Sequence, residues 1–104
     1  MENFKNVELV AKANVYFDGN VTSRSFITSS NERKTLGVML KGDYVFSTNE
    51  AEIMEILAGS AKVKIANETS FKEYKEGDSF NVPANSSFII NVETICDYCC
   101  SFLK

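Results

Sequence analysis

The chain has 104 residues, a length that fits a single domain with its own hydrophobic core. Its formal net charge is −3 with both signs interspersed, which disfavours nucleic acid as a partner because binding a phosphate backbone needs a basic surface. No basic segment precedes a long apolar run, so the sequence shows neither a signal peptide nor a membrane span. We therefore expect a soluble, cytoplasmic protein.

Histidine is absent from the sequence. Most catalytic zinc and non-haem iron sites use imidazole ligands, and the common nucleophilic triads use a histidine base. The composition therefore predicts no metal site. Catalysis, if present, has to use carboxylates, hydroxyls, amides, arginine, lysine or tyrosine.

Residues 1–13 form an N-terminal extension, for which a short helix and an added edge strand both stay open. From residue 14 onward, short runs rich in β-branched and aromatic residues are separated by glycine-containing turn signals, at a spacing of about 8–12 residues. This spacing is typical of a β-sandwich or barrel, so residues 14–104 are predicted to form one β domain. The predicted strands are 14–17, 21–28, 35–40, 43–47, 53–58, 61–65, 71–74, 79–82, 88–92 and 96–102, with a turn at 58–60 among the connections.

The most specific stretch runs from Gly77 to Phe88. A turn at Gly77 leads into a strand at 79–82, which Pro83 should end because proline lacks the backbone donor. Asn85 tolerates the left-handed conformation that a tight corner requires. The spacing Gly77-x5-Pro83-x-Asn85-x2-Phe88 resembles the second conserved motif of the cupin superfamily, whose metal-binding members carry a histidine at the position of Phe88.

Further motifs resemble those of the small single-cupin pyrimidine/purine nucleoside phosphorylases, from about residue 14 to the C-terminus. They are Tyr16-Phe17-x-Gly19, Gly37-Val38-Met39, Gly42-x-Tyr44-x-Phe46-Ser47-Thr48, Glu52-x-Met54, Gly59, Tyr74-x-x-Gly77-x-x-Phe80-Asn81-Val82-Pro83 and Tyr98-x-Cys100.

The resemblance implies an all-β, single-domain cupin, an RmlC-like jelly-roll β-barrel without the metal-binding histidines. It also implies a homodimeric, metal-independent glycosyltransferase without a cofactor. Such an enzyme cleaves pyrimidine and purine nucleosides with inorganic phosphate as co-substrate, giving free base and α-D-ribose 1-phosphate.

The segment 28–35 is the best candidate for binding phosphate. Ser29 and Ser30 supply hydroxyl donors, and Arg33 supplies a planar guanidinium that suits paired charge-assisted hydrogen bonds. An exposed polar hairpin loop would have the same composition, so that alternative stays open.

Candidate substrate-binding residues lie on the predicted strand 43–47 and just after it. Tyr44, Phe46 and Thr48 share one face by alternation, and the rings of Tyr44 and Phe46 suit stacking on a nucleobase. The alternative is that these side chains fill the interior of the barrel. Asn81 is a candidate for hydrogen bonding to a base edge, or a structural turn residue beside Pro83.

Glu52 is the catalytic candidate, because it stands where the first cupin motif places its carboxylate ligand. Without a metal it can bind ribose hydroxyls, or donate a proton to the leaving base if its pKa is raised. The alternative is a solvated acid in the acidic run at 50–52.

The three cysteines, Cys96, Cys99 and Cys100, raise the alternative of a zinc or redox site. Strand alternation places Cys99 on the face opposite the other two, and no fourth ligand is evident, so structural thiols are predicted. At the level of the whole chain, two alternatives to an enzyme stay open: a non-catalytic cupin barrel that binds a small polar ligand, and a purely structural dimer module.

Overall fold

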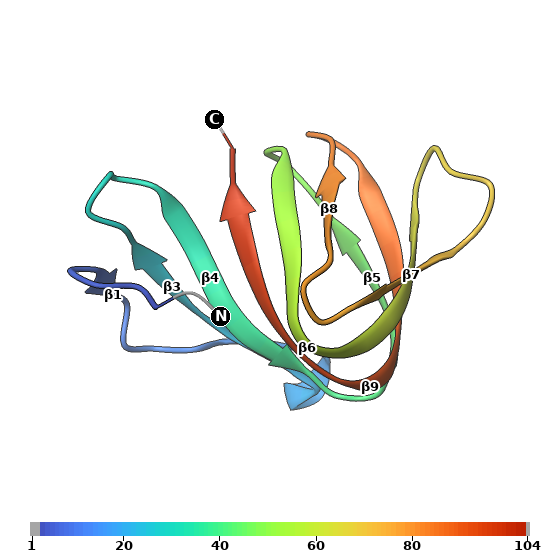
Figure 1. The fold of residues 1–104 in the computed structure, drawn as a ribbon, viewed down its shortest axis with the longest axis horizontal. Helices are drawn as coiled ribbons and strands as arrows, with labels where there is room; N and C mark the ends of the chain where they lie inside the picture. Colours follow the sequence, from blue (N-terminus) through green and yellow to red (C-terminus); the bar gives the residue numbers. More distant parts are fainter. Residues whose placement is uncertain (1–2, 104) are drawn as a thin grey trace.

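A computed structural model describes residues 3–103 of the chain, and its regular structure consists of β-strands and one 3-10 turn (Figure 1). No helix within these residues is long and apolar enough to cross a membrane. The elements are β1 (Glu8–Leu9), β2 (Asn14–Tyr16), η1 (Phe17–Gly19), β3 (Val21–Ile27), β4 (Arg33–Met39), β5 (Gly42–Ser47), β6 (Glu52–Ile65), β7 (Lys72–Lys75), β8 (Ser79–Val82) and β9 (Ser87–Phe102).

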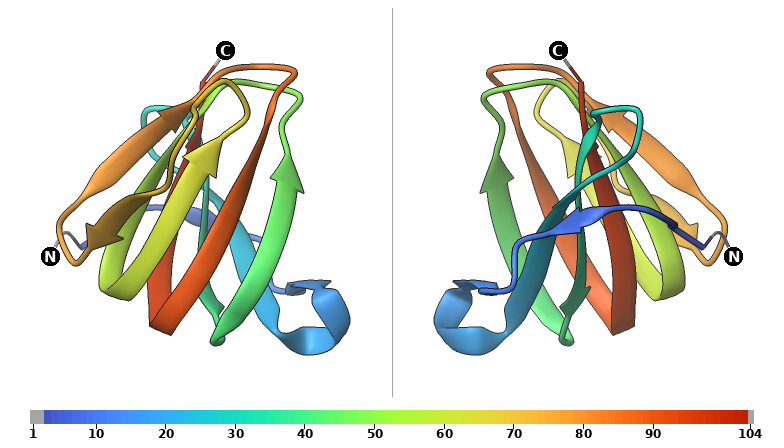
Figure 2. Two further views of the ribbon diagram at one scale, coloured as in Figure 1. Left: turned by 90° about the vertical axis from the view of Figure 1, so that its right-hand side faces the viewer. Right: turned by 90° about the vertical axis from the view of Figure 1, so that its left-hand side faces the viewer.

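The strands form two layers that share the long antiparallel pair of β6 and β9 (Figures 1 and 2). Pairing runs from Glu52 opposite Phe102 to Ile65 opposite Phe88. The first half of β6 and the second half of β9 lie in one layer with β3, β4 and β8. Their other halves lie in the second layer with β5 and β7. The predicted all-β jelly roll is confirmed.

The predicted turn at 58–60 and the predicted break between 92 and 96 are wrong, because each lies inside a single bent strand. The register of β6 against β9 shifts repeatedly between Ile56 and Ala61, which marks a bulged bend. Gly59 has φ +89°, and a Cβ added there would lie 2.1 Å from the carbonyl oxygen of Ile95. The glycine signal therefore marks a close approach of two backbones instead of a hairpin turn.

Alternation along the strands fills the space between the layers with apolar side chains. Phe88, at the position of the cupin metal ligand, is 2% exposed and stacks on Phe46 with ring centroids 5.4 Å apart. Its other face meets Phe80 edge-on at 5.6 Å. Where metal-binding cupins carry a histidine, this chain therefore has part of an aromatic core.

The predicted corner before β9 is confirmed. Strand β8 ends at Val82, directly before Pro83, and Asn85 has φ +53°. Thr48 holds this corner from a distance of 35 residues: its hydroxyl donates to the carbonyl of Pro83 at 2.7 Å and accepts from the backbone N–H of Ser86 at 3.0 Å. The corner that connects β8 in one layer with the start of β9 in the other is thereby fixed to the end of β5.

Part of the N-terminal extension adds a short edge strand. Glu8 and Leu9 form β1, which pairs with Ile27 and Phe26 of β3. The ring of Phe4 packs on that of Phe26 with centroids 4.9 Å apart. Of the two alternatives for this segment, the structure has the edge strand at residues 8–9.

Candidate functional site

A cavity of about 200 Å³ lies between the two layers and is called the inter-layer cavity below. It reaches from β2 to the N-terminal end of β6 and to β5 in the facing layer. Its lining combines hydroxyl groups, one carboxyl, one thiol and aromatic rings: Tyr16, Ser23, Thr35, Met39, Phe46, Ser47, Glu52, Met54, Phe88, Tyr98, Cys100 and Phe102.

Glu52, the predicted catalytic residue, begins β6 and lines this cavity. Partial burial of the carboxyl group is the main cause that raises its pKa, and the neighbouring charge of Glu50 raises it further. The thiol of Cys100 hydrogen-bonds with the carboxylate and acts in the opposite direction. Burial and the adjacent Glu52 raise the pKa of the Cys100 thiol, so this thiol stays protonated as a donor. Glu52 thus holds its proton more tightly than an exposed glutamate does.

Further polar groups line the wall formed by β3, β4 and β9. Ser23 and Tyr98 are hydrogen-bonded through their side chains, and Asn14 donates to Ser23 Oγ at 3.2 Å. Burial raises the pKa of Tyr98 to about 12, so its hydroxyl remains neutral. Thr35 adds a buried hydroxyl on the neighbouring strand β4. These neutral donors and acceptors suit a hydroxyl-rich ligand such as a sugar.

Arg33 lies beside the same cavity. Its guanidinium carbon stands 4.4 Å from the ring centroid of Phe102, which lines the cavity, and its side chain pairs with Glu50. Arg33 is half exposed, so its charge is accessible to a soluble anion. Ser29 and Ser30 are exposed in the turn between β3 and β4, and neither lines the cavity.

Of the predicted substrate-binding residues, Phe46 lines the inter-layer cavity and three others do not. The hydroxyl of Tyr44 donates to the carbonyl of Leu40 at 2.7 Å, and that of Thr48 is used at the Pro83 corner. Asn81 is exposed on β8, between the buried residues Phe80 and Val82. The structure therefore does not bring Tyr44, Thr48 and Asn81 together with Glu52 and Phe46.

Sequence reasoning missed the lining residue Ser23, and it included Thr35 only as the last residue of the candidate phosphate segment 28–35. Ser23 and Thr35 are polar residues at inward positions of otherwise apolar strands, and this parity is the signal that could have found them. The inward set of Cys96, Tyr98, Cys100 and Phe102 follows the predicted alternation. Cys99 is buried on the other side of β9, where it lines an outer hollow, so the thiols do not converge on a common site.

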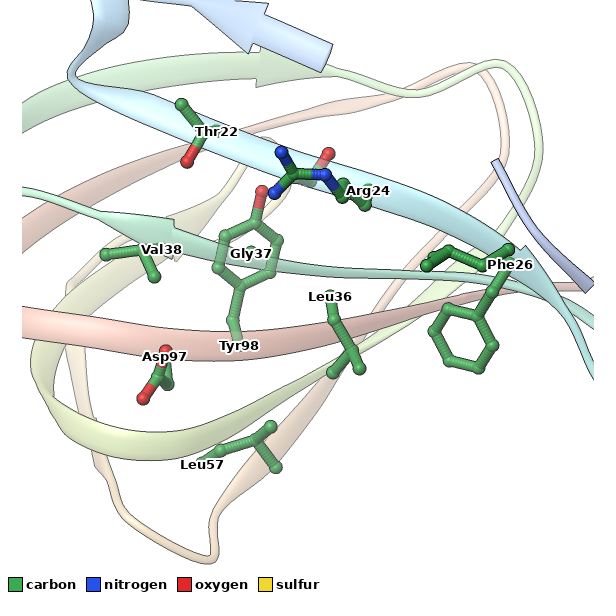
Figure 3. Close-up of a pocket in the computed structure, with 11 residues that line it drawn as sticks. Thr22, Arg24, Phe26, Leu36, Gly37, Val38, Leu57, Asp97 and Tyr98 are labelled. Atoms are coloured by element: carbon green, nitrogen blue, oxygen red, sulfur yellow. The ribbon is translucent and has the colours of Figure 1, made fainter. Parts of the chain in front are cut away.

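A larger hollow of about 410 Å³ lies on the outer face of β3, β4, β9 and β6 (Figure 3). Arg24, Leu36, Leu57 and Asp97 surround it, and Gly37 leaves its floor without a side chain. A second hollow of about 330 Å³ continues it past Leu36 and Leu57. Both outer hollows are larger than the inter-layer cavity. The inter-layer cavity is still the better candidate for a functional site, because it brings together the half-buried acid, the thiol and the hydroxyls. Within the described residues, no group of three or more Cys, Asp or Glu side chains is placed to hold a metal ion.

The raised pKa of Glu52 predicts a pH-dependent effect of Glu52→Gln on stability. Since the folded pKa lies above the unfolded one, the carboxyl stabilises the fold at low pH, and this contribution is lost as pH rises through the folded pKa. The variant should therefore gain stability relative to wild type as pH rises from about 4 to about 7. Urea unfolding of both proteins across this range measures the difference. Glu73→Gln, at an exposed acid on β7, controls for loss of one charge, and a pH-independent difference for Glu52→Gln would contradict the prediction.

Comparison with known proteins places this architecture in a family. The model of a family described as pyrimidine/purine nucleoside phosphorylase matches residues 11–102. A protein of that name from Clostridioides difficile is 58% identical over 99% of this chain and 98% of its own, and one from Geotalea daltonii is 56% identical over 99% of both.

Solved structures bear on the fold. A crystal structure of a protein of unknown function from Acinetobacter has a TM-score of 0.93 and 38% identity, covering 97% of this chain and 98% of that one. An RmlC-like cupin from Shewanella frigidimarina, with a TM-score of 0.69 and 18% identity over 98% and 90% of the two chains, shares the fold. The fold is therefore that of a cupin, and the chain belongs to the pyrimidine/purine nucleoside phosphorylase family.

Proposed function

We propose that this chain is a cytoplasmic, metal-independent nucleoside phosphorylase that needs no cofactor. It transfers the ribosyl group of pyrimidine and purine nucleosides to inorganic phosphate, which gives free base and α-D-ribose 1-phosphate. One observation supports the proposal beyond family membership: a half-buried acid, Glu52, and an accessible cation, Arg33, lie at a single cavity. Glu52 lines this cavity, and Arg33 contacts the ring of Phe102, which lines it too.

The two charged groups suit the two ends of the reaction. A phosphate oxygen attacks the anomeric carbon from the side opposite the base, and the bond from that carbon to the base nitrogen breaks with its electrons moving onto the base. Glu52, protonated, gives its proton to the departing base and recovers one from the phosphate group. Because the raised pKa keeps a larger share of Glu52 protonated near neutral pH, this carboxyl suits the role of general acid.

Arg33 is the proposed phosphate anchor, with Ser29 and Ser30 as hydroxyl donors on the same turn. In the free protein Glu50 pairs with the guanidinium, and phosphate, with more charge and three acceptor oxygens, replaces it as partner. Stacking on Phe102 keeps the guanidinium at the edge of the cavity. Phe46 offers a ring against which the substrate packs from the facing layer.

The first test is phosphate-dependent release of base. Purified protein is incubated with uridine and with adenosine, with and without phosphate, while free base is followed by chromatography. We expect release of both bases only when phosphate is present, at a rate that a chelator does not change. Absence of release would favour the alternative, a non-catalytic barrel that binds a small polar ligand, and inhibition by chelator that added metal reverses would contradict a metal-free site.

The second test removes the positive charge of Arg33. Arg33→Ala should raise the KM for phosphate about tenfold or more, because it removes charge-assisted hydrogen bonds to the anion. Lys75→Ala is the control for loss of one exposed positive charge, since Lys75 lies on β7 and lines neither the inter-layer cavity nor the outer hollows. Initial rates at varied phosphate measure both variants, and equal phosphate KM values for the two would remove Arg33 from the site.

We also infer that the protein acts as a homodimer through the outer face of β3, β4, β9 and β6. Leu36 and Leu57 stand between the two hollows there, with Arg24 on one side and Glu55 on the other. A two-fold axis near the leucines would place Arg24 of one copy on the side of its partner that carries Glu55. Light scattering should give twice the chain mass for wild type and about one chain mass for Leu36→Lys. The control Val45→Lys, at an exposed residue on β5, should keep twice the chain mass. A wild-type mass of one chain would refute the dimer.

A further inference from the structure

The inter-layer cavity is smaller than the usual pocket that encloses a small-molecule ligand. Its volume is about 200 Å³, whereas pockets that bury most of a small-molecule ligand hold about 300–1,000 Å³. One half of the substrate therefore enters the cavity while the other half remains at the opening. The chemistry of the lining decides whether the ribose or the base enters the cavity.

The ribose fits the interior. The buried lining groups that can hydrogen-bond are the hydroxyls of Ser23, Thr35 and Tyr98 and the thiol of Cys100, with the carboxyl of Glu52 beside them. A ribose carries hydroxyl groups that match such partners, and burying these groups unpaired would be costly. A ribose offers hydroxyls on several of its carbons that can join these groups, whereas a flat base offers polar atoms only along its edge, so the base belongs at the opening.

Tyr16 is the aromatic residue of the lining that is most open to solvent. It is 46% exposed, yet it lines the inter-layer cavity, and its hydroxyl is close enough to influence the pKa of the buried Tyr98. Its ring therefore has one part in the cavity and another at the surface. A base held at the opening can stack on such a ring whether it is a pyrimidine or a purine, because every base has a π-face.

The backbone holds Tyr16 in this place from both sides. Strand β2 pairs Tyr16 with Val21 of β3, and the following residue, Phe17, packs its ring 5.0 Å from Tyr44 and 5.4 Å from Phe46. Phe17 also has φ +52°, which is rare for a bulky residue and requires surroundings that fix it. The turn after Tyr16 is thereby attached to β5 in the facing layer.

We propose that Tyr16 is the nucleobase platform of this site: the base stacks on its ring at the opening while the ribose enters the cavity. This inference rests on the proposed phosphorolysis and identifies the residue that determines which nucleosides are accepted. A platform that stacks without hydrogen-bonding the base edge accounts for tolerance of both base classes, and it binds the larger purine surface more tightly.

The test compares Tyr16→Ala, Tyr16→Leu and Tyr16→Phe with wild type. Loss of the ring in the Ala and Leu variants should raise the KM for nucleosides about tenfold or more, with a larger change for adenosine than for uridine and an unchanged KM for phosphate. Tyr16→Phe keeps the ring and should stay within about twofold of wild type. Phe71→Ala is the matched control, because Phe71 is an equally exposed aromatic residue outside the cavity, also at 46%.

A separate measurement keeps this inference distinct from the proposed function. Calorimetric titration of wild type and Tyr16→Ala with adenosine and uridine in the absence of phosphate reports binding alone. If wild type binds nucleosides without turning them over, and Tyr16→Ala binds them more weakly, the platform is supported and the phosphorylase proposal is overturned. Active wild type with unchanged nucleoside KM and affinity in both ring-deleting variants would overturn the platform and leave the phosphorylase standing. A Tyr16→Ala effect on nucleosides that Phe71→Ala reproduces would also overturn it.

Discussion

The pairing of β6 with β9 is the constraint on which the candidate site depends. These two strands run together from Glu52 and Phe102 at one end to Ile65 and Phe88 at the other, and they cross from one layer to the other. The acid of the cavity, its thiol partner and its central aromatic ring are therefore set by one ladder of backbone hydrogen bonds. The shifts in register at the bend decide which residues of the ladder face the cavity, so the site is fixed mainly by main-chain geometry.

An aromatic interior and a half-buried acid belong together in this barrel. Phe46, Phe80 and Phe88 pack on one another in the core, and their rings carry no charge that could stabilise an anion. A carboxyl beside such surroundings holds its proton more tightly than in water, which is the direction seen for Glu52. The apolar surroundings of the cavity thus favour the protonated form of the acid.

The sequence predicts the architecture because the signals for it are local. Turn residues, the single proline and period-two alternation lie within a few residues of the structure they specify, and the corner at Pro83 and Asn85 follows from them. Alternation also predicts correctly that Cys100 and Phe102 share a face. Bends are harder, since Gly59 looks like a turn residue until the distant Ile95 is known to lie against it.

The candidate site is less predictable for the same reason. Thr48 has the residue type of a ligand-binding group, but its hydroxyl is already bound to a corner 35 residues away. Tyr44 likewise uses its hydroxyl on Leu40. Sequence pattern reports which side chains can hydrogen-bond, whereas the choice of partner depends on tertiary placement. Glu52 lines the cavity as expected, because a motif spacing specified its position in the barrel as well as its type.

The buried ring of Phe88 also limits how this barrel can change in evolution. Phe88→His alone would place an imidazole between Phe46 and Phe80, where the near carboxyl of Glu52 makes at most a second ligand, and zinc sites in proteins use three or four. A further ligand at Thr48 would break both hydrogen bonds that hold the Pro83 corner. Each intermediate would bury an unpaired polar group or lose a tertiary contact without gaining a metal. A metal site at this position would therefore need several simultaneous substitutions.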